Sequence, residues 1–349
     1  MPPLPIFPTS PIFPSSSSTL SMNGICTLAN DLVYDQLIAL LNSIEAIYGH
    51  TMPVCIYPYD DRVEKIAEAI RARPQVQLYQ DRTSIERWDQ FVRQIWDLHP
   101  TARQRWGNSD PAYYHRVGTH RRFCAFDGPF ERFLYMDADT LLLDSVDSIF
   151  AALGQHDWVV YDFQYKDPTH VYEMTAKLDQ IFGLERVQTE IFCSGFYASK
   201  RYLFDQAARE QLLQALRNGD AEILYPMAPD QTILNYMVMK SAISSLNLAL
   251  SLPASQRTGN SVTSPHFIER DHQLYDRGKR LTYLHYIGIS SQWFARLCAG
   301  ENIDFPYRDL FLHYRYLKEP RPSFSTLPKP YNARPSLMQR VIKKVGLGH

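Results

Sequence analysis

The sequence feature that most constrains the fold is an apolar stretch, Phe133 to Met136, followed by two carboxylates, Asp137 and Asp139. Such a run predicts a buried strand, in which side chains two residues apart point the same way, about 6.6 Å apart. A slight bend at the strand end lets both carboxylates face one cation, and carboxylates suit Mg²⁺ or Mn²⁺. A cation with open positions can hold a diphosphate and stabilise its departure. The stretch therefore predicts a metal site at a sheet edge.

Helix capping is an alternative interpretation of the two acidic residues. Short acidic side chains before a helix accept hydrogen bonds from its free N–H groups. Asp144 and Ser145 stand directly before a predicted helix at residues 146–150 and fit that role better. The metal interpretation is therefore favoured for Asp137 and Asp139.

Composition narrows the class of protein. The chain has 349 residues, 45% hydrophobic and 21% charged, which suits one large globular domain. Its 36 basic and 37 acidic side chains give a formal net charge of −1, so no overall field favours nucleic acid as a partner. The five cysteines are scattered and form no Cys-x-x-Cys pair, which indicates a reducing, cytoplasmic setting and no zinc site.

The two ends of the chain differ in composition from the middle. Residues 1–21 are rich in Pro and Ser and carry no basic residue before their apolar positions, which predicts disorder rather than a secretory signal. Met22 precedes the first predicted strand, so we expect the native start there. Residues 317–349 are Pro-rich and then basic, which predicts a flexible tail, with weak membrane or partner contact as the alternative. No stretch approaches the roughly 18 apolar residues of a membrane span, so we expect at most peripheral membrane contact.

Strands and helices alternate along the chain, as in a parallel sheet with helical crossovers. Predicted strands cover residues 23–29, 53–57, 76–79, 133–137, 158–161, 191–197 and 281–284, and predicted helices cover residues 31–48, 62–73, 117–126, 204–217 and 230–240. Residues 84–115 are aromatic and irregular, and a helical cover is favoured over an insertion at the binding site. Ligands of open sheets bind beyond the carboxyl ends of strands, where Asn30 and Asp137 would share one site.

The strand end Leu-Tyr-Met-Asp-Ala-Asp-Thr, residues 134–140, resembles the metal motif of GT-A glycosyltransferases. The nearest likeness is to glycosyltransferase family 8, the glycogenins and bacterial lipopolysaccharide galactosyltransferases. The resemblance implies an α/β fold of GT-A (Rossmann-like) type, with a mixed, mainly parallel sheet flanked by helices in a single large domain at residues 22–316. It also implies a nucleotide-sugar donor, Mn²⁺ (or Mg²⁺), and retention of the anomeric configuration.

The resemblance extends to the first strand and to a basic segment before the metal motif. The segment Thr27 to Asp31 with Tyr34 is similar to the turn that holds the nucleotide, so Ala29 and Asn30 would contact the donor and Tyr34 would stack on uracil. Asn30 or Asp31 as an ordinary helix cap is the alternative. The family has a basic residue facing the donor where Arg121 stands, with Arg122 possible in a shifted register; a solvated helix face is the alternative.

Two later segments complete the resemblance on the sugar side. Residues 191–196 resemble the family's Phe-Asn-Ala-Gly strand, with Cys193 in place of the asparagine. Asp230, Gln231 and Asn235 resemble its Asp-Gln-x-x-x-Asn helix start, which implies that Asp230 and Gln231 act catalytically beside the transferred sugar. Asp230 as a helix N-cap is the alternative.

The last matching segment is His285-Tyr286-Ile287-Gly288, similar to the family's His-x-x-Gly. The resemblance implies that His285 is the third metal ligand beside Asp137 and Asp139, while Ala138, Gly288 and Ser291 contact the donor. Ser291 stands where the family has a lysine that contacts the diphosphate. The charge of the diphosphate would then be met by the metal, by Arg121 or by another base.

The predicted function is transfer of a sugar from a nucleotide-diphosphate donor, most simply a uridine diphosphate sugar, to a carbohydrate, lipid-linked, protein or small-metabolite acceptor. A haloacid-dehalogenase-like phosphatase is one alternative, but its Asp-x-Asp-x-Thr motif would need the threonine one position after Thr140 and would open the fold. An inactive relative that binds a sugar nucleotide is another, suggested by Cys193 and Ser291. Sugar nucleotidyltransferases open with a Gly-rich basic loop, which residues 27–34 lack.

Overall fold

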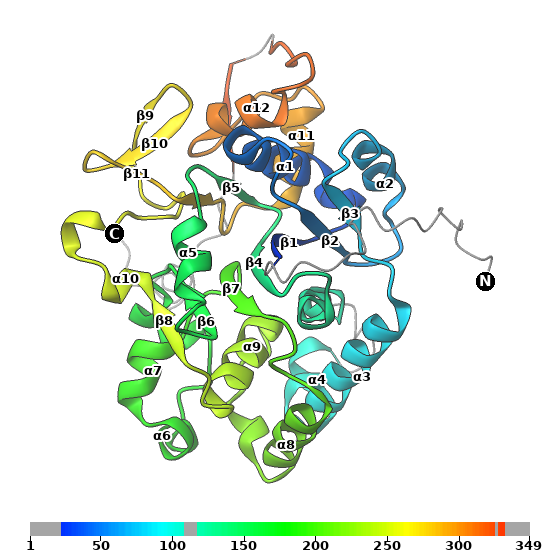
Figure 1. Cartoon of the computed structure of the whole chain (residues 1–349), viewed down its shortest axis with the longest axis vertical. Coiled ribbons are helices and arrows are strands. Elements are labelled where there is room, and N and C mark those ends of the chain that lie inside the picture. Colours follow the sequence, from blue (N-terminus) through cyan, green and yellow to red (C-terminus); the bar gives the residue numbers. More distant parts are fainter. Residues whose placement is uncertain (1–21, 108–116, 325–326, 332–349) are drawn as a thin grey trace.

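The computed structural model describes residues 22–107, 117–324 and 327–331 (Figure 1). Within them, seven strands form one mixed sheet in the order β3-β2-β1-β4-β7-β6-β8. The strands are β1 Asn23–Ala29, β2 Val54–Pro58, β3 Val76–Leu78, β4 Arg132–Met136, β6 Trp158–Val160, β7 Phe196–Lys200 and β8 Ser245–Asn247. All of these run in one direction except β7, which is antiparallel to both β4 and β6. The expected mixed, mainly parallel sheet is confirmed.

Helices cover both faces of the sheet. They are α1 Tyr34–Tyr48, α2 Glu64–Ile70, α3 Arg82–Leu98, α4 Ala102–Trp106, α5 Asp147–Ala152, α6 Ala176–Phe182, α7 Leu184–Glu190, α8 Gln206–Arg217, α9 Pro229–Lys240, α10 Leu248–Ser251, α11 Ser291–Cys298 and α12 Arg308–Arg315, with 3-10 helices η1 Asp31–Val33 and η3 Val117–Asp127. No helix in the described parts of the chain is long and apolar enough to cross a membrane.

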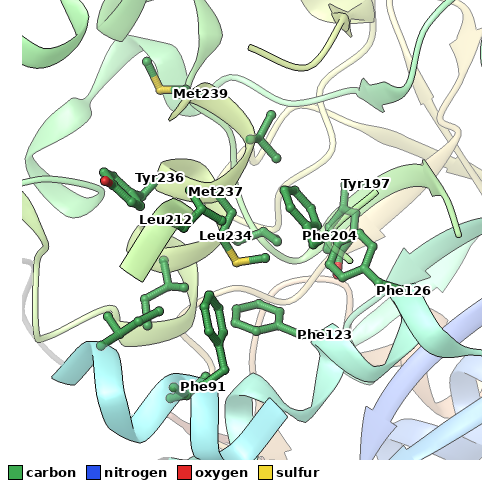
Figure 2. Packing of buried hydrophobic residues seen from close by; sticks show 14 of the residues in the cluster. Phe91, Phe123, Phe126, Tyr197, Phe204, Leu212, Leu234, Tyr236, Met237 and Met239 are labelled. Atoms are coloured by element: carbon green, nitrogen blue, oxygen red, sulfur yellow. The ribbon is translucent and has the colours of Figure 1, made fainter. Parts of the chain in front are cut away.

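Two hydrophobic clusters sandwich the sheet. Along β1, Cys26 and Leu28 face a cluster built with α3, η3, α8 and α9, while Ile25 and Ala29 face a cluster built with α1 and α5. Figure 2 shows part of the first cluster, in which aromatic, leucine and methionine side chains of these helices pack together with Phe204 and with Tyr197 of β7. Burial on both faces explains why the strands are apolar runs without alternation.

Small sheets extend the domain at its C-terminal side. A two-stranded antiparallel sheet joins β5 Thr140–Leu142 to β12 Tyr283–His285, a hairpin-like sheet joins β9 Ile268–Arg270, β10 Gln273–Asp276 and β11 Lys279–Arg280, and a parallel pair joins β13 Ile303–Asp304 to β14 Lys329–Pro330. Of this region, β5, α11 and α12 pack against α1, while β9, β10 and β11 lie farther from it (Figure 1). A third hydrophobic cluster lies around α11 and α12, and Tyr331 packs against it. With the pairing of β14 to β13, this contact ties part of the expected flexible tail to the domain.

Several predicted boundaries need correction. The predicted strand at 191–197 begins only at Phe196, because the side chain of Asn235 takes both backbone groups of Phe192: its Oδ1 accepts from Phe192 N at 2.9 Å and its Nδ2 donates to Phe192 O at 2.8 Å. The predicted helix at 117–126 is a 3-10 helix. The helical cover is confirmed for residues 84–98 and 102–106, which belong to α3 and α4, and residues 108–115 lie outside the described residues, as do 1–21.

The sheet's aromatic ladder generates a stability prediction. Trp158 is fully buried and stacks on Tyr197, with ring centroids 4.5 Å apart, and its ring is tilted against that of Phe192 at 5.0 Å. We expect Trp158→Ala to lower the free energy of unfolding by about 3–5 kcal/mol in urea denaturation, since a large cavity opens. Trp293→Ala, on a half-buried side chain of α11, is the control and should cost about 1 kcal/mol. Equal losses would contradict the stacking argument.

Candidate functional site

The carboxyl ends of the strands bring three potential metal ligands together. Asp137 directly follows β4, and Asp139 lies between β4 and β5. The β5–β12 pairing sets Thr140 opposite His285, and Tyr286 N donates to Asp139 O at 2.9 Å. The pairing of β12 with β5 therefore places a histidine that is distant in sequence beside the two acidic residues.

The three side chains form a compact donor set. One ligand atom each from Asp137, Asp139 and His285 lies within 4.8 Å of the others, and His285 Nε2 is 3.4 Å from Asp139 Oδ1. Gly195 lines this group: a Cβ there would lie 2.6 Å from His285 Cε1 and 2.8 Å from Asp137 Oδ2. Two carboxylates and an imidazole fit Mn²⁺ or Mg²⁺, and the missing side chain at Gly195 leaves room beside them.

Burial and mutual attraction set the charges of this group. Burial raises the pKa of Asp137 above its ordinary value, and the nearby Arg122 offsets this only in part. Burial also acts to raise the pKa of Asp139, but the interaction with His285 outweighs it and the pKa is lowered. Burial acts to lower the pKa of His285, yet Asp139 raises it well above its ordinary value. A divalent cation would replace the proton on His285, because a metal-bound imidazole must be neutral.

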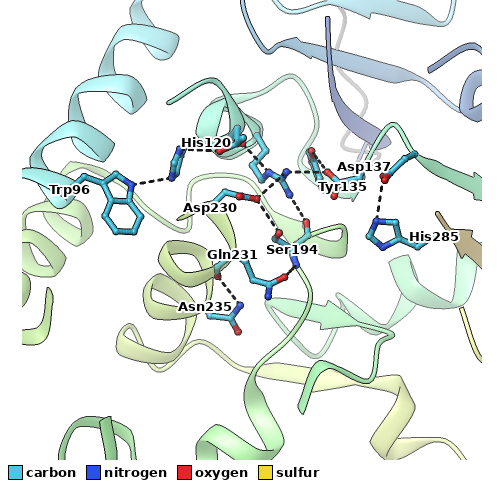
Figure 3. A network of polar contacts seen from close by, with 12 residues as sticks. Trp96, His120, Tyr135, Asp137, Ser194, Asp230, Gln231, Asn235 and His285 are labelled. Atoms are coloured by element: carbon cyan, nitrogen blue, oxygen red, sulfur yellow. Dashed lines mark hydrogen bonds and ion pairs between the residues drawn. The ribbon is translucent and has the colours of Figure 1, made fainter. Parts of the chain in front are cut away.

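Arg122 links the candidate metal ligands to the start of α9. Its side chain is 7% exposed, and its Nη2 lies 3.1 Å from both Asp137 Oδ1 and Asp230 Oδ2 (Figure 3). Nη1 donates to Ser194 O at 2.8 Å and Nε donates to Thr119 O at 3.0 Å. One buried guanidinium thus pairs with two carboxylates on different elements.

Arg121, the first choice from the sequence, is paired elsewhere. Its guanidinium bonds Asp89 on α3, at 2.9 Å from Nη2 to Oδ2, and Tyr59 O at 3.3 Å. Neighbouring residues of the 3-10 helix η3 point about 120° apart, so Arg121 faces α3 while Arg122 faces Asp137. The structure therefore brings Arg122, the alternative register, to Asp137.

Asp230 and Gln231 lie beside the same network. Ser194 Oγ donates to Asp230 Oδ2 at 3.1 Å, and Ser194 N donates to Gln231 Oε1 at 3.3 Å. Burial acts to raise the pKa of Asp230, but Arg122 outweighs it and lowers the pKa. The capping alternative for Asp230 is wrong, because α9 begins at Pro229 and the N-cap position is Ala228.

The residues expected at the nucleotide have visible structural roles. Asn30 Oδ1 accepts from Leu32 N at 3.1 Å and caps η1, and its Nδ2 donates to Asp60 Oδ2 at 2.9 Å. Ala29 ends β1, on the sheet edge that also carries the end of β4. Tyr34 is half-buried under Lys65, whose Nζ lies 4.4 Å from the ring centre. Their contacts with a nucleotide stay predictions.

The remaining predicted donor contacts flank the three ligands. Ala138 is buried between Asp137 and Asp139. Gly288 has φ +82°, in the left-handed region that favours glycine, and turns the chain after β12. Ser291 is the first residue of α11.

Sequence reasoning missed one buried acid at the same edge. Asp162 follows β6, is 3% exposed, and accepts from Gln164 N at 2.7 Å through Oδ1. Its Oδ2 has no hydrogen-bond partner among the described residues. Burial raises the pKa of Asp162 to about 7, and the nearby charge of His285 acts in the opposite direction. An acid just after the apolar run 158–161 is the signal that would have found it, as it did for Asp137.

Comparisons with known proteins identify the fold of the chain. No family model matches the chain, and no curated protein matches it in sequence. Among solved structures, the apo form of WbbM, a bifunctional glycosyltransferase, superposes with a TM-score of 0.52 at 12% identity, over 86% of this chain and 50% of WbbM. The chain has the GT-A fold. It spans half the length of WbbM.

Two further solved structures resemble the chain more distantly. Mouse xyloside xylosyltransferase 1 gives a TM-score of 0.44 at 12% identity, over 65% of this chain and 85% of that protein. The galactosyltransferase LgtC, in complex with donor and acceptor sugar analogues, gives a TM-score of 0.44 at 14% identity, over 79% of this chain and 95% of that protein.

The close approach of Gly195 yields a prediction about metal binding. We expect Gly195→Ala to raise the dissociation constant for Mn²⁺ at least tenfold, because the added methyl group would contact both His285 and Asp137. Electron paramagnetic resonance of free Mn²⁺ measures this. Gly154→Ala is the control, since its Cβ would meet only Ala151 O at 3.1 Å. Unchanged Mn²⁺ affinity in Gly195→Ala would contradict the proposed ligand group.

Asp162 yields a pH-dependent prediction. Because its pKa is raised to about 7 on folding, the unfolded chain ionises it first, and the free energy of unfolding falls as pH rises from about 4 to about 7. Asp162→Asn removes this pH dependence of the free energy of unfolding, and its amide oxygen can still accept the hydrogen bond from Gln164 N. The stability of the variant relative to wild type should therefore rise by about 2 kcal/mol between pH 5.5 and 8.5. Urea denaturation in EDTA tests this, and a constant difference would refute it.

Proposed function

We propose that the protein is a metal-dependent glycosyltransferase that moves a sugar from a nucleotide-diphosphate donor to an acceptor. The observation that carries the proposal is the group of Asp137, Asp139 and His285 at the carboxyl edge of a GT-A sheet. Ligands of open α/β sheets bind at this edge. The fold alone would not assign an activity. The three potential metal ligands add the chemistry that a diphosphate leaving group needs.

The residues have distinct roles in this proposal. Asp137, Asp139 and His285 would hold Mn²⁺ or Mg²⁺, and such an ion offsets the charge that builds on the departing diphosphate. Arg122 fixes the orientation of Asp137 and Asp230, since one nitrogen contacts both carboxylates. Asp230 and Gln231 then present polar atoms where the transferred sugar would lie.

The finer features of the reaction rest on the resemblance to family 8. We propose a uridine diphosphate sugar as donor and retention of the anomeric configuration, with Asp230 or Gln231 steadying an oxocarbenium-like sugar. Ser291 contributes a hydrogen bond where the family has a lysine. The acceptor is a carbohydrate, a lipid-linked sugar or a protein.

Donor binding is testable by thermal shift with uridine, guanosine, adenosine and cytidine diphosphate sugars, each with and without Mn²⁺. We expect a rise in melting temperature with a uridine diphosphate sugar that requires Mn²⁺, since the ion bridges protein and diphosphate. Asp139→Ala should abolish both this rise and donor cleavage. Asp144→Ala, five residues away at a partly exposed acid, is the matched control and should keep both.

Three outcomes would oppose the proposal. Near-normal donor cleavage by Asp139→Ala would remove the metal role. Donor binding without hydrolysis or transfer would favour an inactive sugar-nucleotide-binding relative. Hydrolysis of a generic phosphoester, with no response to any donor, would favour a phosphatase.

A further inference from the structure

The helical cover, α3 and α4, contacts both chain segments that build the Arg122 network. Trp96 on α3 donates from Nε1 to His120 Nε2 at 3.3 Å, two residues before Arg122 (Figure 3). Trp106 on α4 donates from Nε1 to Pro226 O at 2.9 Å, four residues before Asp230. The two indole rings meet edge to face with centroids 4.9 Å apart. This pair of indole rings thus links the segment that carries Arg122 to the segment just before Asp230.

On the Arg122 side, hydrogen bonds connect the indole to the guanidinium. The indole N–H can only donate, so Nε2 of His120 accepts and a neutral imidazole carries its proton on Nδ1. Nδ1 lies 3.3 Å from Thr119 Oγ1, and Thr119 O accepts from Arg122 Nε at 3.0 Å. His120 is 1% exposed, so this arrangement is shielded from water. Trp96 therefore anchors His120, and the adjacent Thr119 supplies the carbonyl to which Arg122 donates.

On the Asp230 side, the tryptophan holds the entry to α9. Pro226 lies three residues before Pro229, the first residue of α9. The turn between them is closed by Ala228 N donating to Tyr225 O at 3.2 Å and by Tyr225 N donating to Thr232 Oγ1 at 3.0 Å. A shift of the Pro226 carbonyl would therefore carry Asp230 with it.

We propose that Trp96, Trp106 and His120 are positioning residues of the site: together they fix the spacing between Arg122 and Asp230. This proposal rests on the proposed glycosyl transfer, because the spacing matters to the sugar held beside Asp230. At 3.1 Å to each of two carboxylates, Arg122 Nη2 has little room to move before one contact is lost. A displacement of about 1 Å in such a site typically costs about a hundredfold in rate.

The test compares three Trp→Phe variants of the full chain. Trp96→Phe and Trp106→Phe each keep an aromatic ring but remove the indole donor. Trp88→Phe is the matched control, since Trp88 is also buried on α3 and donates from Nε1 to Asp127 Oδ2 at 2.9 Å. With Mn²⁺ and the best donor, we expect kcat for donor cleavage to fall about tenfold in the first two, with KM within about twofold. The control should stay within about twofold in both.

A second measurement does not depend on activity. Crystal structures of the three variants should show the contact between Arg122 and Asp230 lengthened or lost in Trp96→Phe and Trp106→Phe, and kept in Trp88→Phe. An unchanged contact and unchanged kcat in the first two would overturn the positioning role, as would an equal fall in kcat for the control. A wild-type protein that cleaves no donor would oppose the proposed function instead, and the crystal structures would still decide the positioning role.

Discussion

The acidic edge of the sheet depends on the buried charge of Arg122. Asp137 and Asp230 come from different elements, and both lie 3.1 Å from one guanidinium nitrogen. Without that cation the two carboxylates would repel each other or take up protons, and removing one partner of a buried pair costs about 3–5 kcal/mol. The carbonyls of Thr119 and Ser194 complete its hydrogen bonds. The side chain of Arg122 therefore links the three segments that carry Asp137, Ser194 and Asp230.

The direction of the strands decides what else can reach this edge. Because β4 and β6 run parallel and β7 runs between them in the opposite direction, β7 starts where its neighbours end. Gly195, just before β7, is therefore set among the ends of other strands, against Asp137 and His285. Asp162 reaches the same edge after β6, and its raised pKa follows from burial there. A single reversed strand thus brings backbone, rather than a side chain, to the middle of the candidate metal site.

Patterns of apolar and acidic residues were sufficient to predict the strands of the first half, a mainly parallel sheet, and the pair Asp137 and Asp139, because these features depend on local periodicity. The resemblance to family 8 added His285, whose approach depends on the β5–β12 pairing. The choice between Arg121 and Arg122 was not predictable, since it depends on how η3 packs against α3. The late start of β7 was not predictable either, because it depends on the distant side chain of Asn235. Long-range contacts of this kind leave no periodic trace in sequence.

The β5–β12 pairing also links the candidate site to the completeness of the fold. Asp139 and His285 are separated by 285 − 139 = 146 positions in the chain, so a cation held by both would close a very long loop. Closing such a loop is entropically costly, and a ligand that bridges its ends acts as a crosslink that the unfolded chain lacks. Cation affinity would then report on whether the C-terminal third has docked. In a nascent chain in which β12 has not yet paired with β5, only two of the three ligands are in place and the site is incomplete.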